Sequence, residues 1–161
     1  MIDPMKRRMP PLILGWREWI GLPDLKVERI KAKVDTGART SALHAWDIHP
    51  FRRGDNTFVK FVLHPIQRNN DVEVACTARV IDTRYVRSSI GQREKRYVIQ
   101  STVKLGEFSW PIEITLTNRD EMGFRMLLGR SALHRDVLVA PRSSYRLGKP
   151  KRKRSIKKRS R

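Results

Sequence analysis

Apolar and polar residues alternate over several short stretches of the chain, which is the pattern of strands with one buried and one exposed face. The clearest alternation covers 72–80, where every second residue is small and apolar. Another covers 29–34, with Ile30, Ala32 and Val34 on one face and basic residues on the other. Further strands are predicted over 57–63, 96–104, 108–117 and 137–139.

No stretch shows the 3.6-residue period of a long amphipathic helix, and the strands recur at the spacing of a sandwich or barrel. Leu105 and Gly106 predict a hairpin turn between two of the strands. An apolar run over 126–128 stops at Gly129, and a short helix is predicted over 131–134. The sequence therefore predicts an all-β fold with one short helix.

The stretch 82–96 is polar and contains a single glycine, Gly91. Its composition favours a solvated loop, because polar segments between strands usually run over the surface. A mobile hairpin lying over a cleft is the alternative.

Length and charge divide the chain into three parts. At 161 residues it is long enough for one compact domain. The last thirteen residues contain nine Lys or Arg and no acid, so the net charge of +19 leaves +10 for the rest. Such a segment has too little apolar surface to fold. We expect a flexible N-terminus over 1–11, one domain over 12–141 and a disordered basic tail over 142–161.

Composition also sets expectations about partners and compartment. The basic tail is a candidate for binding RNA or other nucleic acid, with a solubilising extension as the alternative. No apolar run approaches the ~20 residues that a membrane helix needs, so no membrane contact is predicted. The single Cys76 lies in an apolar alternation, which predicts a buried thiol and a reducing compartment. We therefore expect a cytoplasmic protein.

The segment 32–45, AKVDTGARTSALHA, contains the main chemical signal. An apolar strand leads into Asp35, and a carboxylate there is costly unless it is hydrogen-bonded or lies in a cleft. Gly37 permits a tight turn, in which its N–H can donate a hydrogen bond to the carboxylate. The Thr36 hydroxyl can form a hydrogen bond with the neighbouring backbone. In an aspartic protease, two such carboxylates share one proton. Asp-Thr-Gly alone more often marks a turn, so the rest of the chain decides its meaning.

Several further segments make a family resemblance specific. They are GWREW at 15–19, LPDL at 22–25, RYVRSS at 84–89, RYVI at 96–99 and LTNRDEMGFRMLLGRSAL at 116–133. Together with the Asp-Thr-Gly segment, they resemble the retropepsin-like proteins often called ATP-dependent zinc proteases and found with RimK-type glutamate ligases. The resemblance covers most of the chain but not the basic tail.

The resemblance implies a retropepsin-like closed barrel, equivalent to one lobe of an aspartic protease, with Asp35 as the catalytic carboxylate. It also implies a homodimer, because the chain has one Asp-Thr-Gly and Asp82-Thr83-Arg84 lacks the glycine. The residues expected to support the active-site loop are Thr36, Gly37, Ala38, Leu128, Gly129 and Arg130.

The expected substrate is a peptide or protein, and the association with ATP-grasp glutamate ligases suggests an acidic or glutamate-rich one. Arginine side chains suit carboxylates because they offer planar donors. The alternative for these arginines is an ordinary solvated basic surface. The candidate substrate-binding residues are Arg39, His44, Arg84, Arg87 and Arg96.

Two other functions stay open. A zinc-dependent hydrolase is disfavoured because the four histidines form no His-Glu-x-x-His, and His44 and His49 have no Cys or Glu that completes a known ligand set. No metal or other cofactor is therefore predicted, and without a Walker-type loop any ATP dependence would belong to a partner ligase. The other function is a noncatalytic basic module that binds RNA or ribosomal components.

Overall fold

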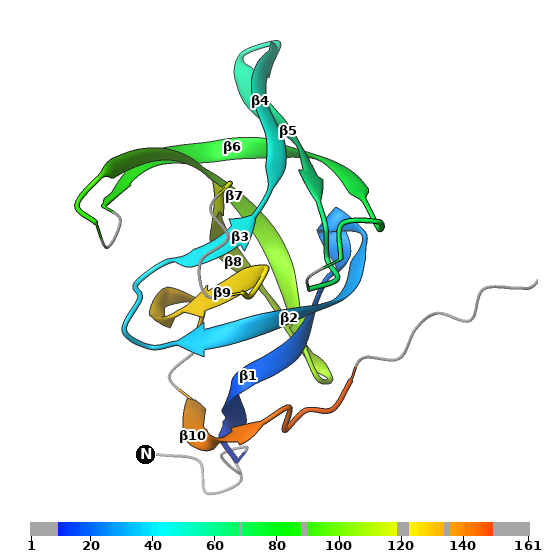
Figure 1. Cartoon of the computed structure of the whole chain (residues 1–161), viewed down its shortest axis with the longest axis vertical. Coiled ribbons are helices and arrows are strands. Elements are labelled where there is room, and N and C mark those ends of the chain that lie inside the picture. The colour runs from blue at the N-terminus through cyan, green and yellow to red at the C-terminus, as the bar shows by residue number, and fades with distance from the viewer. Residues whose placement is uncertain (1–9, 68, 88–89, 119–122, 134–135, 150–161) are drawn as a thin grey trace, which may run out of the picture.

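The computed structural model describes residues 10–67, 69–87, 90–118, 123–133 and 136–149 (Figure 1). The ten strands are β1 (Leu12–Leu22), β2 (Val27–Asp35), β3 (Ser41–His44), β4 (Trp46–Arg53), β5 (Asn56–Leu63), β6 (Val74–Arg87), β7 (Arg93–Leu105), β8 (Phe108–Thr117), β9 (Met126–Gly129) and β10 (Val137–Ser144). Two single 3-10 turns are η1 (Pro23–Leu25) and η2 (Arg130–Ala132). No helix within these ranges is long and apolar enough to cross a membrane.

Six strands form a closed barrel in the order β1-β2-β9-β3-β8-β7, and a pairing of Gly21 with Lys104 joins β7 back to β1. The pairs β2–β9 and β3–β8 are parallel, and the other neighbours in the barrel are antiparallel. Strands β6, β5 and β4 continue the sheet beyond β7, and β10 lies parallel to β1. The predicted all-β fold with a closed barrel is confirmed.

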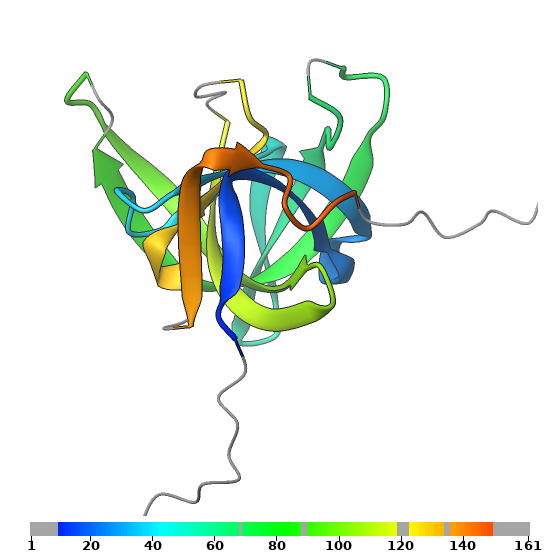
Figure 2. The ribbon, with the colours of Figure 1, turned by 90° about the horizontal axis from the view of Figure 1, so that it is seen from below.

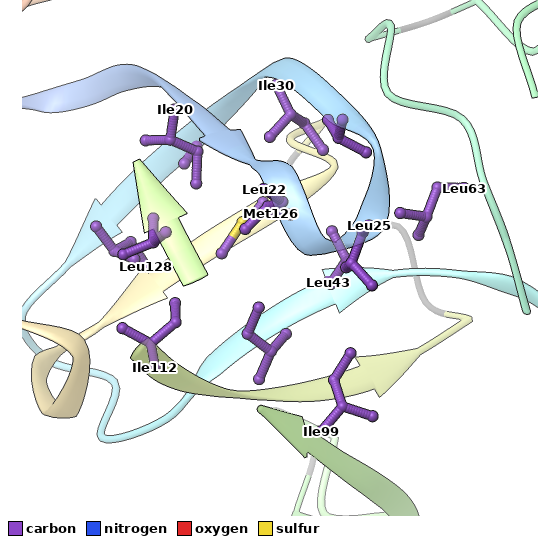
Figure 3. Close-up of a cluster of buried hydrophobic side chains, with 14 of the residues drawn as sticks. Ile20, Leu22, Leu25, Ile30, Leu43, Leu63, Ile99, Ile112, Met126 and Leu128 are labelled. Atoms are coloured by element: carbon purple, nitrogen blue, oxygen red, sulfur yellow. The ribbon is translucent and has the colours of Figure 1, made fainter. Parts of the chain in front are cut away.

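Side chains from all six barrel strands fill the interior (Figure 3). Fully or nearly fully buried members of this cluster are Ile20 and Leu22 of β1, Ile30 of β2, Leu43 of β3, Ile99 of β7, Ile112 of β8, and Met126 and Leu128 of β9. Each such side chain contributes roughly 1.5–3 kcal/mol by leaving water. The apolar faces that the alternation predicted for β2, β7 and β8 therefore point into the barrel.

Most predicted strands are found, and several are longer than expected. Strand β8 has the predicted bounds, and the strand predicted over 72–80 begins at Val74 and continues to Arg87. Cys76 within it is buried, as predicted, and burial raises the pKa of its thiol to about 11. Such a thiol is protonated at neutral pH and therefore a poor nucleophile.

Strands β1, β3 and β4 were not predicted. In β1 the alternation is broken because Gly15 and the carboxylate of Glu18 are buried among its apolar residues. Strand β4 belongs to a hairpin that projects from the barrel, where most of its residues are exposed and leave no buried face to detect (Figure 1). The predicted short helix is only the single 3-10 turn η2, and His134 lies outside the described residues.

The prediction of a solvated loop over 82–96 is wrong. Strands β6 and β7 pair antiparallel from Val80 with Ile99 out to Arg87 with Arg93, so most of the stretch is a two-stranded hairpin. The polar composition misled the prediction because both strands extend beyond the barrel, where neither face needs to be apolar. This is the geometry of the alternative that we considered, a hairpin.

Ordered structure continues past 141, where we placed the start of the basic tail. Strand β10 runs to Ser144, and the backbone N–H groups of Arg146 and Leu147 donate to the buried Glu18 carboxylate at 3.1 and 3.2 Å. Burying this carboxylate requires such donors, so Glu18 attaches the end of the domain to β1. Residues 1–9 and 150–161 lie outside the described residues.

Candidate active site

The carboxylate of Asp35 is fixed by the chain turn that follows it. Asp35 is the last residue of β2, and its Oδ1 accepts hydrogen bonds from the N–H groups of Gly37 at 3.0 Å and Ala38 at 3.2 Å. The Asp35 side chain is partly exposed, and Gly37 is exposed. The result is a carboxylate at the end of a barrel strand whose position is set by main-chain donors.

Strand β9 and the turn η2 hold the same loop from the other side. The N–H of Arg130 donates to the carbonyl of Ala38 at 2.7 Å, and the N–H of Ser131 donates to that of Arg39 at 2.9 Å. Asp35 also pairs in register with Gly129. The segment Leu128–Gly129–Arg130, nearly a hundred residues away in sequence, is therefore packed against the Asp35 turn.

Gly129 is required by a close approach of two backbones. A Cβ at this position would lie 2.5 Å from the carbonyl carbon of Thr40 and 2.6 Å from its oxygen. These atoms belong to the main chain, so they have little room to move. The glycine predicted from the apolar-apolar-Gly pattern thus lets β9 approach the loop.

The Arg130 side chain adds a further connection. Its Nη1 donates to the carbonyl oxygen of Thr36 at 2.9 Å. Thr36 therefore binds this partner through its main chain, whereas we expected its hydroxyl to fix the loop. The six residues predicted to support the loop all lie around Asp35: Thr36, Gly37, Ala38, Leu128, Gly129 and Arg130.

Sequence reasoning missed two buried hydroxyls beneath the loop. Ser41 Oγ accepts the N–H of Gly129 at 3.0 Å, and Thr115 Oγ1 donates to the carbonyl of Ser41 at 2.9 Å. Both residues are almost fully buried. The available signal was a hydroxyl in the first position of the apolar stretch SALHA, because a buried hydroxyl needs a partner.

The four candidate arginines fall into two groups. Arg84 binds Asp82 at 3.0 Å and Glu113 at 2.7 Å, and the hydrogen bond to Glu113 is the main reason that its pKa is raised. Arg96 is buried and binds Glu94 at 3.0 Å. These two guanidinium groups therefore engage carboxylates of their own chain.

Arg39 and Arg87 are exposed instead. Arg39 lies in the turn that follows Asp35, and Arg87 ends β6 in the β6–β7 hairpin. The hairpin and the Asp35 loop lie on the same side of the barrel in both Figure 1 and Figure 2. Of the four arginines, these two remain open to solvent near that side.

The structure does not bring His44 to Asp35. His44 ends β3, three residues beyond Ser41 and thus about 10 Å further along the strand. Its ring stacks on Trp46 with 3.8 Å between centroids, and Arg125 Nη1 lies 3.4 Å from its Nδ1. His44 belongs to a separate cluster of packed side chains at the opposite end of β3 and β9.

The described part of the chain contains no set of side chains that could bind a metal ion. No group of three or more His, Cys, Asp or Glu side chains there is close enough to hold an ion. His64 meets Trp46 edge-on at 4.3 Å, so both His44 and His64 pack against the same indole. The residues that the structure describes therefore do not form a zinc centre.

A family model described as "Retropepsin-like aspartic endopeptidase RimB" matches residues 13–150. The chain belongs to this RimB-like family of retropepsin-like aspartic endopeptidases. The match includes the Asp35 loop, β9 and the segment after β10. It confirms the family and the class of enzyme that the sequence motifs predicted.

Curated relatives place the same segment in larger proteins. A probable alpha-L-glutamate ligase of Shewanella halifaxensis is 52% identical over 84% of this chain and 30% of its own length. Ligases of the same name from Parasynechococcus marenigrum and Desulfotalea psychrophila are 50% and 42% identical, over 85% and 89% of this chain. The chain spans about 30% of the length of these relatives. In them, a RimB-like segment is part of a protein named as a glutamate ligase.

A crystal structure supports the fold. A Legionella pneumophila protein of unknown function superposes with a TM-score of 0.69 at 26% identity. The superposition covers 84% of this chain and 98% of the Legionella chain. The barrel described above is thus nearly the whole of that protein.

Proposed function

We propose that two copies of this chain form an aspartic endopeptidase whose catalytic dyad consists of Asp35 from each copy. The observation that supports it is the Asp35 carboxylate, partly exposed and held by the N–H groups of Gly37 and Ala38. The chain contains one Asp-Thr-Gly, so a two-fold axis has to supply the second carboxylate.

The dyad provides the acid and the base of peptide hydrolysis. Two carboxyl groups about 3 Å apart retain one proton between them, because both cannot ionise together. The ionised group removes a proton from water as the water oxygen bonds to the scissile carbonyl carbon, while the protonated group donates a hydrogen bond to the carbonyl oxygen. When the intermediate collapses, the C–N bond breaks and the leaving nitrogen takes up the proton that the ionised carboxylate removed from water.

We propose acidic or glutamate-rich peptides as substrates. The relatives that contain this segment are named as glutamate ligases, enzymes whose name implies glutamyl products. Arg39 and Arg87 are exposed in the Asp35 turn and in the hairpin on the same side of the barrel. Guanidinium groups at these places would attract carboxylates as a substrate approaches.

We also propose that the protein works in the cytoplasm beside an ATP-grasp glutamate ligase. Its only cysteine is a buried thiol, which suits a reducing compartment. The fused relatives supply the reason for the ligase, because two activities joined in one chain commonly act on related molecules. Any ATP dependence would then reside in the ligase.

The test compares cleavage of poly-L-glutamate and of a neutral peptide library by the parent protein and by Asp35→Asn. Asn keeps the shape of the side chain but cannot share the proton, so the rate should fall roughly a thousandfold. Asp55→Asn, an exposed position in the β4–β5 turn, is the matched control and should keep the parent rate. Activity should survive a chelator.

Cleavage that is lost with the chelator and kept by Asp35→Asn would contradict the aspartic mechanism and favour a metal enzyme. Equal turnover of poly-L-glutamate and neutral peptides would leave the mechanism standing and remove the proposed substrate class. Thermal unfolding of each variant shows that a lost rate is not lost folding.

A further inference from the structure

The outer face of β1 and β2 gathers cations around aromatic rings. Arg29 Cζ, Lys31 Nζ and Lys149 Nζ lie 5.9, 5.1 and 5.1 Å from the ring centroid of Trp19. Beside them, Arg17 Cζ lies 4.6 Å from the ring of Trp16 and 4.9 Å from that of Tyr145. We call these seven residues the Trp19 face: Trp16, Arg17, Trp19, Arg29, Lys31, Tyr145 and Lys149.

Strand pairing explains why these residues meet. Trp19 on β1 is the register partner of Lys31 on β2, so the two side chains stand side by side on one face of the sheet. Arg29 is two residues from Lys31 and shares its face, while Ile30 points into the barrel. The N–H of Tyr145 donates to the carbonyl of Arg17 at 2.9 Å, which places the end of the domain on the same face. Figure 2 shows β10 beside β1.

Among the residues that the structure describes, no carboxylate lies within ion-pair distance of the cations of the Trp19 face, Arg17, Arg29, Lys31 and Lys149. Aromatic rings attract these cations without neutralising them. Four positive charges gathered in this way repel one another, and an anionic ligand would relieve that repulsion.

The sequence continues this charge. Lys149 is both a member of the Trp19 face and the first of the nine basic residues in 149–161. Lys149 therefore links the face to the most basic stretch of the sequence.

We propose that the Trp19 face binds single-stranded RNA. Sequence-tolerant binding of single strands combines basic side chains that follow the phosphates with aromatic rings on which bases stack. The Trp19 face provides both, with three rings among four cations. An acidic polypeptide would contact the cations alone, whereas the bases of a single strand would also stack on the rings. This proposal does not depend on the peptidase function.

The test measures binding of a fluorescein-labelled twelve-nucleotide oligouridine by fluorescence anisotropy at several salt concentrations. The face variant carries Arg17→Gln, Arg29→Gln and Lys31→Gln. The matched control carries Arg52→Gln, Arg79→Gln and Lys104→Gln, which removes the same charges at exposed positions of β4, β6 and β7. A third variant ends at Gly148.

The dissociation constant should rise about tenfold more in the face variant than in the control. The slope of log affinity against log salt should also fall by about two, since three phosphate contacts are lost. The chain that ends at Gly148 should bind more weakly than the parent but remain sensitive to the face substitutions. Circular dichroism and thermal unfolding confirm that each variant is folded.

Equal weakening by the face variant and the control would overturn the proposal, because it would mean that only overall charge matters. Tighter binding of poly-L-glutamate than of oligouridine would also overturn it, and would assign the face to an acidic polypeptide. A preference for duplex over single-stranded RNA would remove the role of the rings.

Discussion

The Asp35 loop and the Trp19 face both present a charge that lacks an oppositely charged side chain among the described residues. The Asp35 carboxylate is held by main-chain N–H groups, in a turn that β9 fixes through further main-chain hydrogen bonds. The cations of the Trp19 face lie over rings at the ends of long side chains. One charge has a fixed position, and the others can adapt to a ligand.

This difference has a consequence for function. A reaction that needs two carboxylates to share a proton demands fixed geometry, so changes near Asp35 should act in an all-or-none manner. Electrostatic attraction to a polyanion depends on the number of charges, so changes at the Trp19 face should act in small, additive steps. The arginines Arg84 and Arg96 show a third case, in which a carboxylate of the same chain binds the cation.

The largest effect outside Asp35 itself is expected at Gly129. Gly129→Ala places a Cβ 2.5 Å from the Thr40 carbonyl carbon, and the two backbones have to move apart. We expect the free energy of unfolding to fall by about 3 kcal/mol and peptidase activity to be lost. Urea denaturation and peptide cleavage measure the two effects.

Gly54→Ala is the matched control for this substitution. Gly54 has a φ of 62° but nothing within 4 Å of an added Cβ, so the change should cost only about 1 kcal/mol and leave cleavage intact. Similar losses at both glycines would show that backbone approach at Gly129 is unimportant and that the Asp35 loop is not fixed in the way described.

The smallest effect is expected for a single cation of the Trp19 face. Lys31→Gln removes a charge 5.1 Å from the Trp19 ring without opening the core. The free energy of unfolding should change by about 0.5 kcal/mol or less, because a surface cation–ring contact stabilises weakly. A loss of several kcal/mol in urea denaturation would mean that the face is a structural element, contrary to the comparison.

The sequence predicts the Asp35 loop better than the surface around it. Asp35, Gly37 and Gly129 belong to short motifs whose geometry follows from local chemistry, and the structure brings them together. Arg84 meets Glu113 and His44 meets Arg125, and both partners are distant in sequence, so only the fold reveals these contacts.

The strand β1 was also missed because of contacts between residues that are distant in sequence. The alternation identifies β8 because Ile112, Ile114 and Leu116 on one of its faces are buried, but it fails for β1, where Glu18 is buried among the apolar residues. Glu18 is tolerated because it binds the N–H groups of Arg146 and Leu147, which belong to the segment 142–161 that we assigned to the basic tail. The sequence alone does not show that Glu18 is buried, because its hydrogen-bond donors are distant in the chain.

The central claim is that both carboxylates of the dyad are Asp35, one from each copy. Mixing tests it directly: parent and Asp35→Asn chains are unfolded together in equal amounts, refolded at fixed total concentration, and assayed for peptide cleavage. Random pairing leaves about a quarter of the dimers with two Asp35 side chains, so the account predicts about a quarter of the parent activity. Half of the parent activity, the value expected when each chain works alone, would contradict it.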